Sequence, residues 1–295
     1  MINLKAPAKI NLFLEVTAER PDGYHELSTL FAKVGLYDEL EFEKNPGGIK
    51  LLIDGFIPGQ KDTLNFSDNI IYKAAAAFLD SFAIKSGVTI RLKKNIPVGA
   101  GLGGGSSDGA CALKGMSALF GLGKDRTGKL REIAAGLGSD VPFFISDSTF
   151  AAGLGRGEII EPVEFTGALP YIILVYPGIP VYTRDVYGKL KIAGRPEIRT
   201  KLEIFEKLKS SLSAGKFMSG YKGLLFNRLE DPVLAGYPQV LSAKERLLSA
   251  GADAALMSGS GSTVFGLADN LHKADGIVSA LSSNKNYKVF RINFC

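Results

Sequence analysis

A glycine-rich segment constrains this chain more than any other feature of its sequence. Five of the seven residues from Gly99 to Gly105 are glycine. The segment follows an alternating, strand-like pattern at 88–93 and precedes a helical pattern that runs to Phe120. Because glycine lacks a Cβ atom, such a loop can turn several amide N–H groups toward one point, and the dipole of the following helix attracts negative charge there. The order strand, glycine loop, helix therefore predicts a phosphate-binding loop.

Two familiar nucleotide-binding motifs fit this loop poorly. Residues 99–104 satisfy GxGxxG, a pattern of dinucleotide-binding folds. However, Pro97 interrupts the approach, and Asp125, about 20 residues on, is expected in a loop and not at the end of a second strand. A Walker loop is excluded, because no Gly-Lys pair in the chain is followed by Ser or Thr.

A hydrolase is the serious alternative to a nucleotide-binding protein. Residues 105–109 satisfy GxSxG, and Asp140 and His272 follow Ser107 in the chain order of an α/β-hydrolase triad. A nucleophilic serine should come directly off a buried strand, whereas Ser107 follows a run of glycine-rich residues, and His272 lies in a polar segment typical of the solvated start of a helix. We therefore favour a nucleoside triphosphate held by backbone amides.

Composition narrows the class of partner. The 295 residues carry a net charge of +5 without the Lys/Arg run that marks a nucleic-acid-binding arm, and this mild excess fits a small anionic ligand at least as well as a polymer. The longest apolar stretches, such as 170–177, are too short to cross a membrane. Cys111 and Cys295 stand far apart, so neither a disulfide framework nor a zinc site is indicated. Residues 1–7 resemble neither a secretion signal nor a transit peptide, and we expect a cytoplasmic protein.

The hydrophobic patterns predict an α+β fold of two domains, 1–155 and 156–295. The second half interleaves strands and helices as in a ferredoxin-like α/β sandwich. Strands are predicted at 10–16, 39–43, 49–53, 88–93, 171–176, 263–268 and 288–293. Helices are predicted after Ser67 or Asp68 as N-cap, after a cap among Ser106, Ser107 and Asp108, at 127–137, 201–212 and 240–250, and from about 271.

The segment from Ile96 to Ala110, IPVGAGLGGGSSDGA, resembles the phosphate loop of the GHMP kinases, a family of small-molecule kinases. Four further segments resemble motifs of one member of this family, in the same order along the chain. They are PAKINLFLEV at 7–16, RPDGYHEL at 20–27, GSDVPFF at 138–144 and MSGSGST at 257–263. One departure is Gly109, where the family more often has alanine; glycine weakens a first helical turn by about 1 kcal/mol.

The resemblance implies a fold and a reaction. The fold would be an N-terminal ribosomal-S5-like domain carrying the phosphate loop, followed by a C-terminal ferredoxin-like sandwich. The reaction would be ATP-dependent phosphorylation of the 2-hydroxyl of a cytidyl-linked methylerythritol, in the non-mevalonate route to isoprenoid precursors, with Mg²⁺ beside the ATP. This Mg²⁺ is expected either at Ser107 or mainly on phosphates and water.

The catalytic and nucleotide-binding residues follow from the motifs. Asp140 is expected to be the base, because it stands after a glycine in an apolar context, and the resemblance assigns it that role. By resemblance, Lys9 is the partner cation, and Asn11 shares its strand parity and should point to the same face. The expected ATP-binding residues are Val98, Gly99, Ala100, Gly101, Leu102, Gly103, Gly104, Gly105, Ser106, Ser107 and Asp108.

The remaining expectations concern the acceptor substrate. The resemblance implies that His25 binds the edge of the cytosine ring and that aromatic rings, Tyr24 among them, stack on it. Thr183 and Tyr187, four residues apart on one face of a possible helical turn, match the substrate-side segment of the family. The small-residue loop at 258–262 is expected to support the site without taking part in the chemistry.

Overall fold

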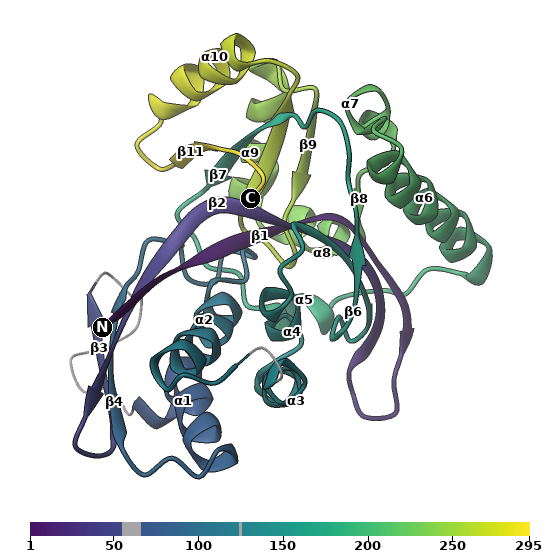
Figure 1. Cartoon of the computed structure of the whole chain (residues 1–295). Helices are drawn as coiled ribbons and strands as arrows, with labels where there is room; N and C mark the ends of the chain where they lie inside the picture. Colours follow the sequence, from purple (N-terminus) through teal and green to yellow (C-terminus); the bar gives the residue numbers. More distant parts are fainter. Residues whose placement is uncertain (55–65, 124–125) are drawn as a thin grey trace. The chain divides into compact units, whose positions relative to one another are not determined.

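The computed structural model describes residues 1–54, 66–123 and 126–295, and shows the expected α+β fold (Figure 1). Asp125 lies outside the described residues. The chain divides into two compact units, each built from several segments. Unit 1 contains residues 1–8, 36–98 and 103–147, and unit 2 contains 9–35, 99–102 and 148–295. The division at 155 and 156 follows the order of the chain and stays a prediction.

Unit 1 joins strands to a group of helices. Strand β4 (Gly87–Lys93) lies between β3 (Ile49–Asp54), to which it is parallel, and the second half of β2 (His25–Asn45), to which it is antiparallel. The helical elements are η1 (Phe66–Asp68), α1 (Ile70–Ser81), α2 (Gly104–Leu119), α3 (Thr127–Leu137) and α4 (Val141–Ile145). Helix α1 packs on α2, and its buried residues are Ile71, Ala74, Ala75 and Phe78.

Two predicted helix starts are wrong by a few residues. The N-cap of α1 is Asn69, whose side chain accepts a hydrogen bond from the amide of Ile71 at 2.8 Å. Helix α2 begins at Gly104, and its N-cap is Gly103 in the left-handed conformation. The residues expected to cap it, 106–108, therefore lie inside the helix, because the glycines alone can make the turn that starts it.

A four-stranded antiparallel sheet forms one part of unit 2. Its order is β11-β7-β10-β9, from β7 (Tyr171–Tyr176), β9 (Ala254–Met257), β10 (Val264–Ala268) and β11 (Lys288–Ile292). Helices α9 (Pro238–Ser249) and α10 (Leu271–Ser282) pack against this sheet and against each other. Strands β7, β10 and β11 and both helices match the predicted elements within three residues. The ferredoxin-like reading of the second half is confirmed.

The rest of unit 2 extends the strand predicted at 10–16 and the helix predicted at 201–212, and it adds several elements that the sequence patterns did not predict. Strand β1 (Ile2–Glu19), which begins in unit 1, pairs here in parallel with β8 (Phe226–Asn227). The first half of β2 pairs with β5 (Phe150–Gly155), which pairs in turn with β6 (Ile159–Val163). The helical elements are α5 (Thr183–Tyr187), α6 (Arg195–Ser213), α7 (Phe217–Gly220), η3 (Tyr221–Gly223) and α8 (Glu230–Gly236). No helix among the described residues is long and apolar enough to cross a membrane.

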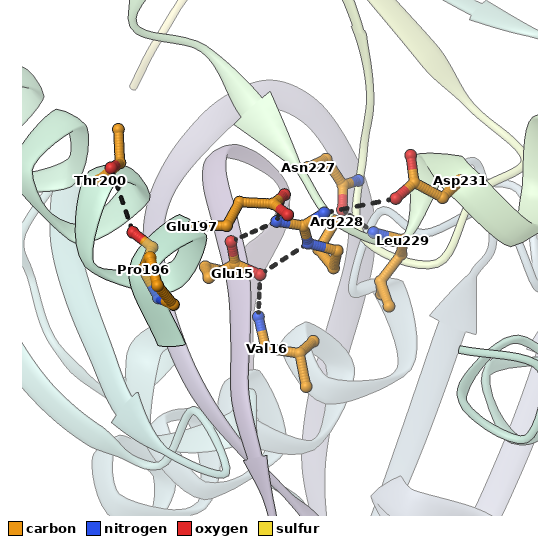
Figure 2. A network of polar contacts seen from close by, with 9 residues as sticks. All are labelled: Glu15, Val16, Pro196, Glu197, Thr200, Asn227, Arg228, Leu229 and Asp231. Carbon is orange, nitrogen blue, oxygen red and sulfur yellow. Dashed lines mark hydrogen bonds and ion pairs between the residues drawn. The ribbon is translucent and has the colours of Figure 1, made fainter. Parts of the chain in front are cut away.

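A buried arginine ties β1 to α6 and α8 (Figure 2). Arg228 donates two hydrogen bonds of 2.8 Å to the fully buried carboxylate of Glu15 on β1. It also pairs with Glu197 in the first turn of α6 at 2.6 Å and with Asp231 at 3.5 Å. A buried carboxylate is stable only when it is paired and hydrogen-bonded, so this network anchors β1 in unit 2.

Candidate active site

The glycine loop is held in place by its carbonyl groups. Four successive carbonyls, those of residues 99–102, each accept one hydrogen bond within unit 2. The donors are the amides of Val181, Thr263 and Lys9 and the hydroxyl of Ser258, at 2.9 to 3.1 Å. The loop conformation depends on Gly99, Gly101 and Gly103, whose φ angles lie between +66° and +74°.

The amide groups of the same loop are left for a ligand. Among the described residues, no hydrogen bond is donated by an amide N–H of residues 99–105. The last of these residues form the first turn of α2, where the helix dipole adds positive potential. An anion is therefore the natural partner of these amides.

The first turns of α2 also carry buried polar side chains. Ser107 is 1% exposed, and its hydroxyl oxygen has no hydrogen-bond partner in the described part of the chain. The Oδ1 atom of Asp108 is likewise buried and unpaired. A buried hydroxyl without a partner is costly unless a ligand or water completes it, so Ser107 fits a cation or phosphate oxygen at the helix start.

Asp108 belongs to a buried cluster of three charged groups in unit 1. Its Oδ2 atom accepts a hydrogen bond of 2.7 Å from Lys94, which also pairs with Asp38. The other oxygen of Asp38 accepts hydrogen bonds from the backbone amides of Asn95 at 2.6 Å and Ile96 at 2.8 Å. Burial, assisted by the Asp38 carboxylate and opposed by Lys94, raises the pKa of Asp108 to about 8. Burial lowers the pKa of Lys94, but the two carboxylates raise it overall.

Asp108→Asn should flatten the dependence of stability on pH. The pKa of Asp108 is about 8 in the folded chain and near its ordinary 3.8 in the unfolded one. Between these values only the folded state binds the proton, so this group's contribution to stability is complete below pH 3.8 and is lost as pH rises through 8. Relative to the variant, the parent should lose up to about 1.4 kcal/mol of unfolding free energy per pH unit between pH 5 and 7 in urea titrations. Parallel curves for the two proteins would show that Asp108 is ionised throughout.

Lys9 and Asn11 lie side by side on β1, as strand parity predicted. The ammonium of Lys9 donates to Asn11 Oδ1 at 2.7 Å, and Asn11 donates to the hydroxyl of Thr29 at 2.7 Å. Thr29 in turn donates to the carbonyl of Phe13 at 2.7 Å. Lys9 is 4% exposed and the other two side chains 1%, so this chain of hydrogen bonds fixes where the ammonium points.

The loop at 258–262 supports the glycine loop, as expected. The hydroxyl of Ser258 donates a hydrogen bond of 2.9 Å to the carbonyl of Gly101. Asn227 donates to the carbonyls of Met257 and Gly259, each at 2.8 Å. The Thr183 hydroxyl, predicted to bind substrate, lies 2.9 Å from the Ser260 hydroxyl, which joins α5 to the same loop.

The predicted aromatic residues each have a partner in unit 2. The rings of His25 and Tyr187 lie 4.8 Å apart, centroid to centroid. Tyr24 is 53% exposed, and the guanidinium of Arg156 lies over its ring at 4.7 Å from the centroid. Three rings and a cation around the start of β2 fit the recognition of a nucleobase.

Asp140 belongs to unit 1. It is half-buried and occupies the N-cap position of α4, where its side chain makes no capping hydrogen bond. Its role as a base and its pairing with Lys9 of unit 2 stay predictions. Among the described residues, no group of three or more His, Cys, Asp or Glu could hold a metal ion.

Several polar residues near these groups had no signal in the sequence. They are Thr29, Asp38, Lys94, Arg156 and Asn227. The partners of Asp38 and Lys94 lie 14 to 58 residues away, so only the fold brings them together. Arg156 lies between Gly155 and Gly157, and this glycine-rich context is the single local feature that could have drawn attention to it.

Comparison with known proteins identifies the family. The model of the GHMP kinases N-terminal domain matches residues 69–148, and that of the GHMP kinases C-terminal domain matches 198–288. The chain belongs to the GHMP kinase family. It is therefore a small-molecule kinase, and the hydrolase alternative is wrong. In agreement, Ser107 is almost fully buried, whereas His272 lies exposed in α10 of the other unit.

Individual relatives share nearly the whole length of this GHMP kinase. The 4-diphosphocytidyl-2-C-methyl-D-erythritol kinase of Syntrophus aciditrophicus (strain SB) is 39% identical over 98% of both chains. The enzyme of that name from Bacillus anthracis is 41% identical over 90% of this chain and 87% of its own. A crystal structure of a 4-(cytidine 5'-diphospho)-2C-methyl-D-erythritol kinase matches with a TM-score of 0.78 at 32% identity, covering 99% of each chain. A mevalonate kinase matches at 0.75 with 15% identity, covering 100% of this chain and 99% of its own, which shows the shared fold alone.

Proposed function

We propose that this GHMP kinase transfers the γ-phosphoryl group of ATP to the 2-hydroxyl of 4-diphosphocytidyl-2-C-methyl-D-erythritol, giving the 2-phosphate and ADP. The observation that carries the proposal is the glycine loop, whose carbonyls at 99–102 are all bonded to unit 2 while its amides are not. Relatives at 39% and 41% identity that bear the name of this kinase support the choice of substrate. The reaction belongs to the non-mevalonate route to isoprenoid precursors.

The loop and helix α2 bind the nucleotide in this mechanism. The amides of residues 99–105 hold the phosphate oxygens, and the start of α2 stabilises their charge. Ser107 suits the Mg²⁺ that accompanies ATP, because its buried hydroxyl oxygen has no partner among the described residues. When bound, Mg²⁺ neutralises charge on the phosphates. Phosphates and water would supply any ligands that the protein does not.

Asp140 acts on the acceptor hydroxyl, and Lys9 acts on the transferred phosphoryl group. Asp140 accepts the proton of the 2-hydroxyl as that oxygen attacks the γ-phosphorus atom. Lys9 stabilises the negative charge of the transfer, and Asn11, bonded to it at 2.7 Å, keeps its ammonium in one position. Phosphoryl transfer depends mainly on positioning and charge neutralisation, and a buried hydrogen-bonded lysine supplies both.

Tyr24, His25 and Tyr187 select the acceptor. Stacking of the cytosine on an aromatic ring and hydrogen bonds from His25 to its edge separate the cytidyl substrate from acceptors of related kinases. Cys111 is buried and Cys295 exposed, both as free thiols, which fits our placement of the reaction in a reducing cytoplasm. No nucleic acid or membrane partner is needed.

The decisive assay measures ADP release from ATP and Mg²⁺ with different acceptors. Release should require the cytidyl-linked methylerythritol and stay at background with free methylerythritol phosphate or homoserine. A uridyl analogue should give a higher KM, since His25 can match only one edge pattern at a time. Equal KM values for the cytidyl and uridyl compounds would contradict the assignment of these residues to a cytosine-binding pocket. Turnover of homoserine alone would make the chain a different GHMP kinase.

Tyr187→Ala should raise KM for the cytidyl substrate about 10- to 100-fold. A base stacked on an aromatic ring contributes about 1 to 3 kcal/mol, and the variant also removes the ring that packs on His25 at 4.8 Å. KM for ATP should change little. Tyr182→Ala is the matched control, because Tyr182 lies on the same segment and is 66% exposed. An increase in KM for ATP in place of the cytidyl substrate would contradict the assignment.

A further inference from the structure

Tyr24 has a fixed backbone and an exposed ring. The turn between β1 and β2 is closed by a hydrogen bond of 2.8 Å from the amide of Arg20 to the carbonyl of Tyr24. The amide of Tyr24 donates to Asp22 Oδ1 at 3.1 Å, and this bond lowers the pKa of that carboxyl. The side chain is nevertheless 53% exposed. Backbone geometry alone therefore does not set the orientation of the ring, and an exposed side chain loses rotamer freedom when it binds.

Arg156 supplies the missing restraint. Its guanidinium lies 4.7 Å from the centroid of the Tyr24 ring, within the range of a cation–π interaction. Arg156 is itself held by Glu158. The carboxylate of Glu158 pairs with the Nε atom of Arg156 at 3.4 Å and accepts a hydrogen bond from its backbone amide. Arg156 lies in the turn between β5 and β6, which is closed by a hydrogen bond of 3.0 Å from the amide of Gly157 to the carbonyl of Leu154.

The two turns are adjacent because of sheet register. Leu27 of β2 is paired with Gly155 of β5, so the residues before β2 and after β5 emerge at the same end of the pair. Tyr24 and His25 then have separate partners, Arg156 for the first and Tyr187 for the second. Arg156 contacts the exposed ring of Tyr24 and the carboxylate of Glu158, neither of which we assign to the phosphoryl transfer.

We propose that Arg156 is a positioning residue for nucleobase recognition, whose guanidinium, fixed by Glu158, holds the Tyr24 ring in the orientation that stacks on the cytosine. This inference rests on the proposed function. The base stacks on the ring face opposite the guanidinium. An orientation set before binding lowers the entropy lost when substrate binds, so Arg156 acts on KM for the cytidyl substrate and not on kcat or on ATP.

A double-mutant cycle tests whether Arg156 affects substrate binding through the ring of Tyr24. Arg156→Met should raise KM for the cytidyl substrate about three- to tenfold, with kcat and KM for ATP unchanged, and Arg156→Lys should restore part of the loss. In a Tyr24→Leu background, Arg156→Met should have no further effect, because the ring it orients is gone. Arg91→Met, which removes an exposed arginine on β4, is the control for charge alone. Additive effects of the two changes would overturn the proposal.

A spectroscopic readout separates this inference from the proposed function. The chain contains no tryptophan, so Tyr24→Trp introduces a single fluorophore at the position of the ring. Adding Arg156→Met to that variant should lower the fluorescence anisotropy of the indole in the absence of any substrate, and Arg91→Met should not. Unchanged anisotropy would overturn the proposal even if the kinase assay succeeds. A parent that does not phosphorylate the cytidyl substrate would overturn the proposed function, and with it the role in base recognition.

Discussion

Asp140→Asn should lower kcat by about 10²- to 10⁴-fold while the affinity for ATP stays near that of the parent. Asparagine keeps the size and polarity of the side chain but cannot accept the proton of the 2-hydroxyl, and general base catalysis contributes on this scale. Because the carboxylate acts on the acceptor and not on the nucleotide, the loss should appear in kcat and not in binding. Single-turnover kinetics and calorimetry with ATP measure the two separately.

The control for Asp140→Asn is Asp147→Asn, which removes a carboxylate that is 98% exposed in the same unit. Activity of Asp140→Asn within tenfold of the parent would exclude this residue as the base.

Lys9→Ala should likewise reduce kcat by several orders of magnitude with the fold intact. A Lys9→Ala effect confined to KM would make Lys9 a binding residue only.

Gly101→Ala should raise KM for ATP by about 100-fold or more and destabilise the chain by about 2 to 4 kcal/mol. A Cβ atom at this position would overlap the carbonyl oxygen of Ser258, and the φ angle of +74° is one that alanine rarely adopts. Relief of the overlap requires moving the loop, which breaks the bond from the Ser258 hydroxyl to the carbonyl of Gly101. Steady-state kinetics and urea unfolding measure the two effects.

Gly121→Ala separates backbone strain from the overlap. Gly121 also has a positive φ, +70°, but an added Cβ would meet nothing within 4 Å, and the residue lies beyond the far end of α2. This variant should lose about 1 kcal/mol of stability with KM for ATP unchanged. If Gly101→Ala behaved in the same way, the close packing of the loop on Ser258 would have no part in ATP binding.

The sequence alone predicted the elements whose signals are local. Apolar periodicity located α3 at 127–137 and β7 at 171–176 to the residue, since each needs only its own pattern. The glycine loop was found for the same reason, because its composition has a direct conformational meaning. Short strands such as β8, with two residues, were missed because they exist only through pairing with β1.

The tertiary structure decided which atoms of the site are free and which are bonded. The sequence placed Asp108 in a phosphate loop, but only the fold brings it to Lys94 and Asp38 and buries all three ionisable groups. The same is true of Arg228, whose partner Glu15 lies 213 residues away. Composition and spacing carry information about the backbone near a residue. Desolvation and charge pairing depend on segments distant in the chain, and these set the pKa of Asp108 and decide which groups of the glycine loop are hydrogen-bonded.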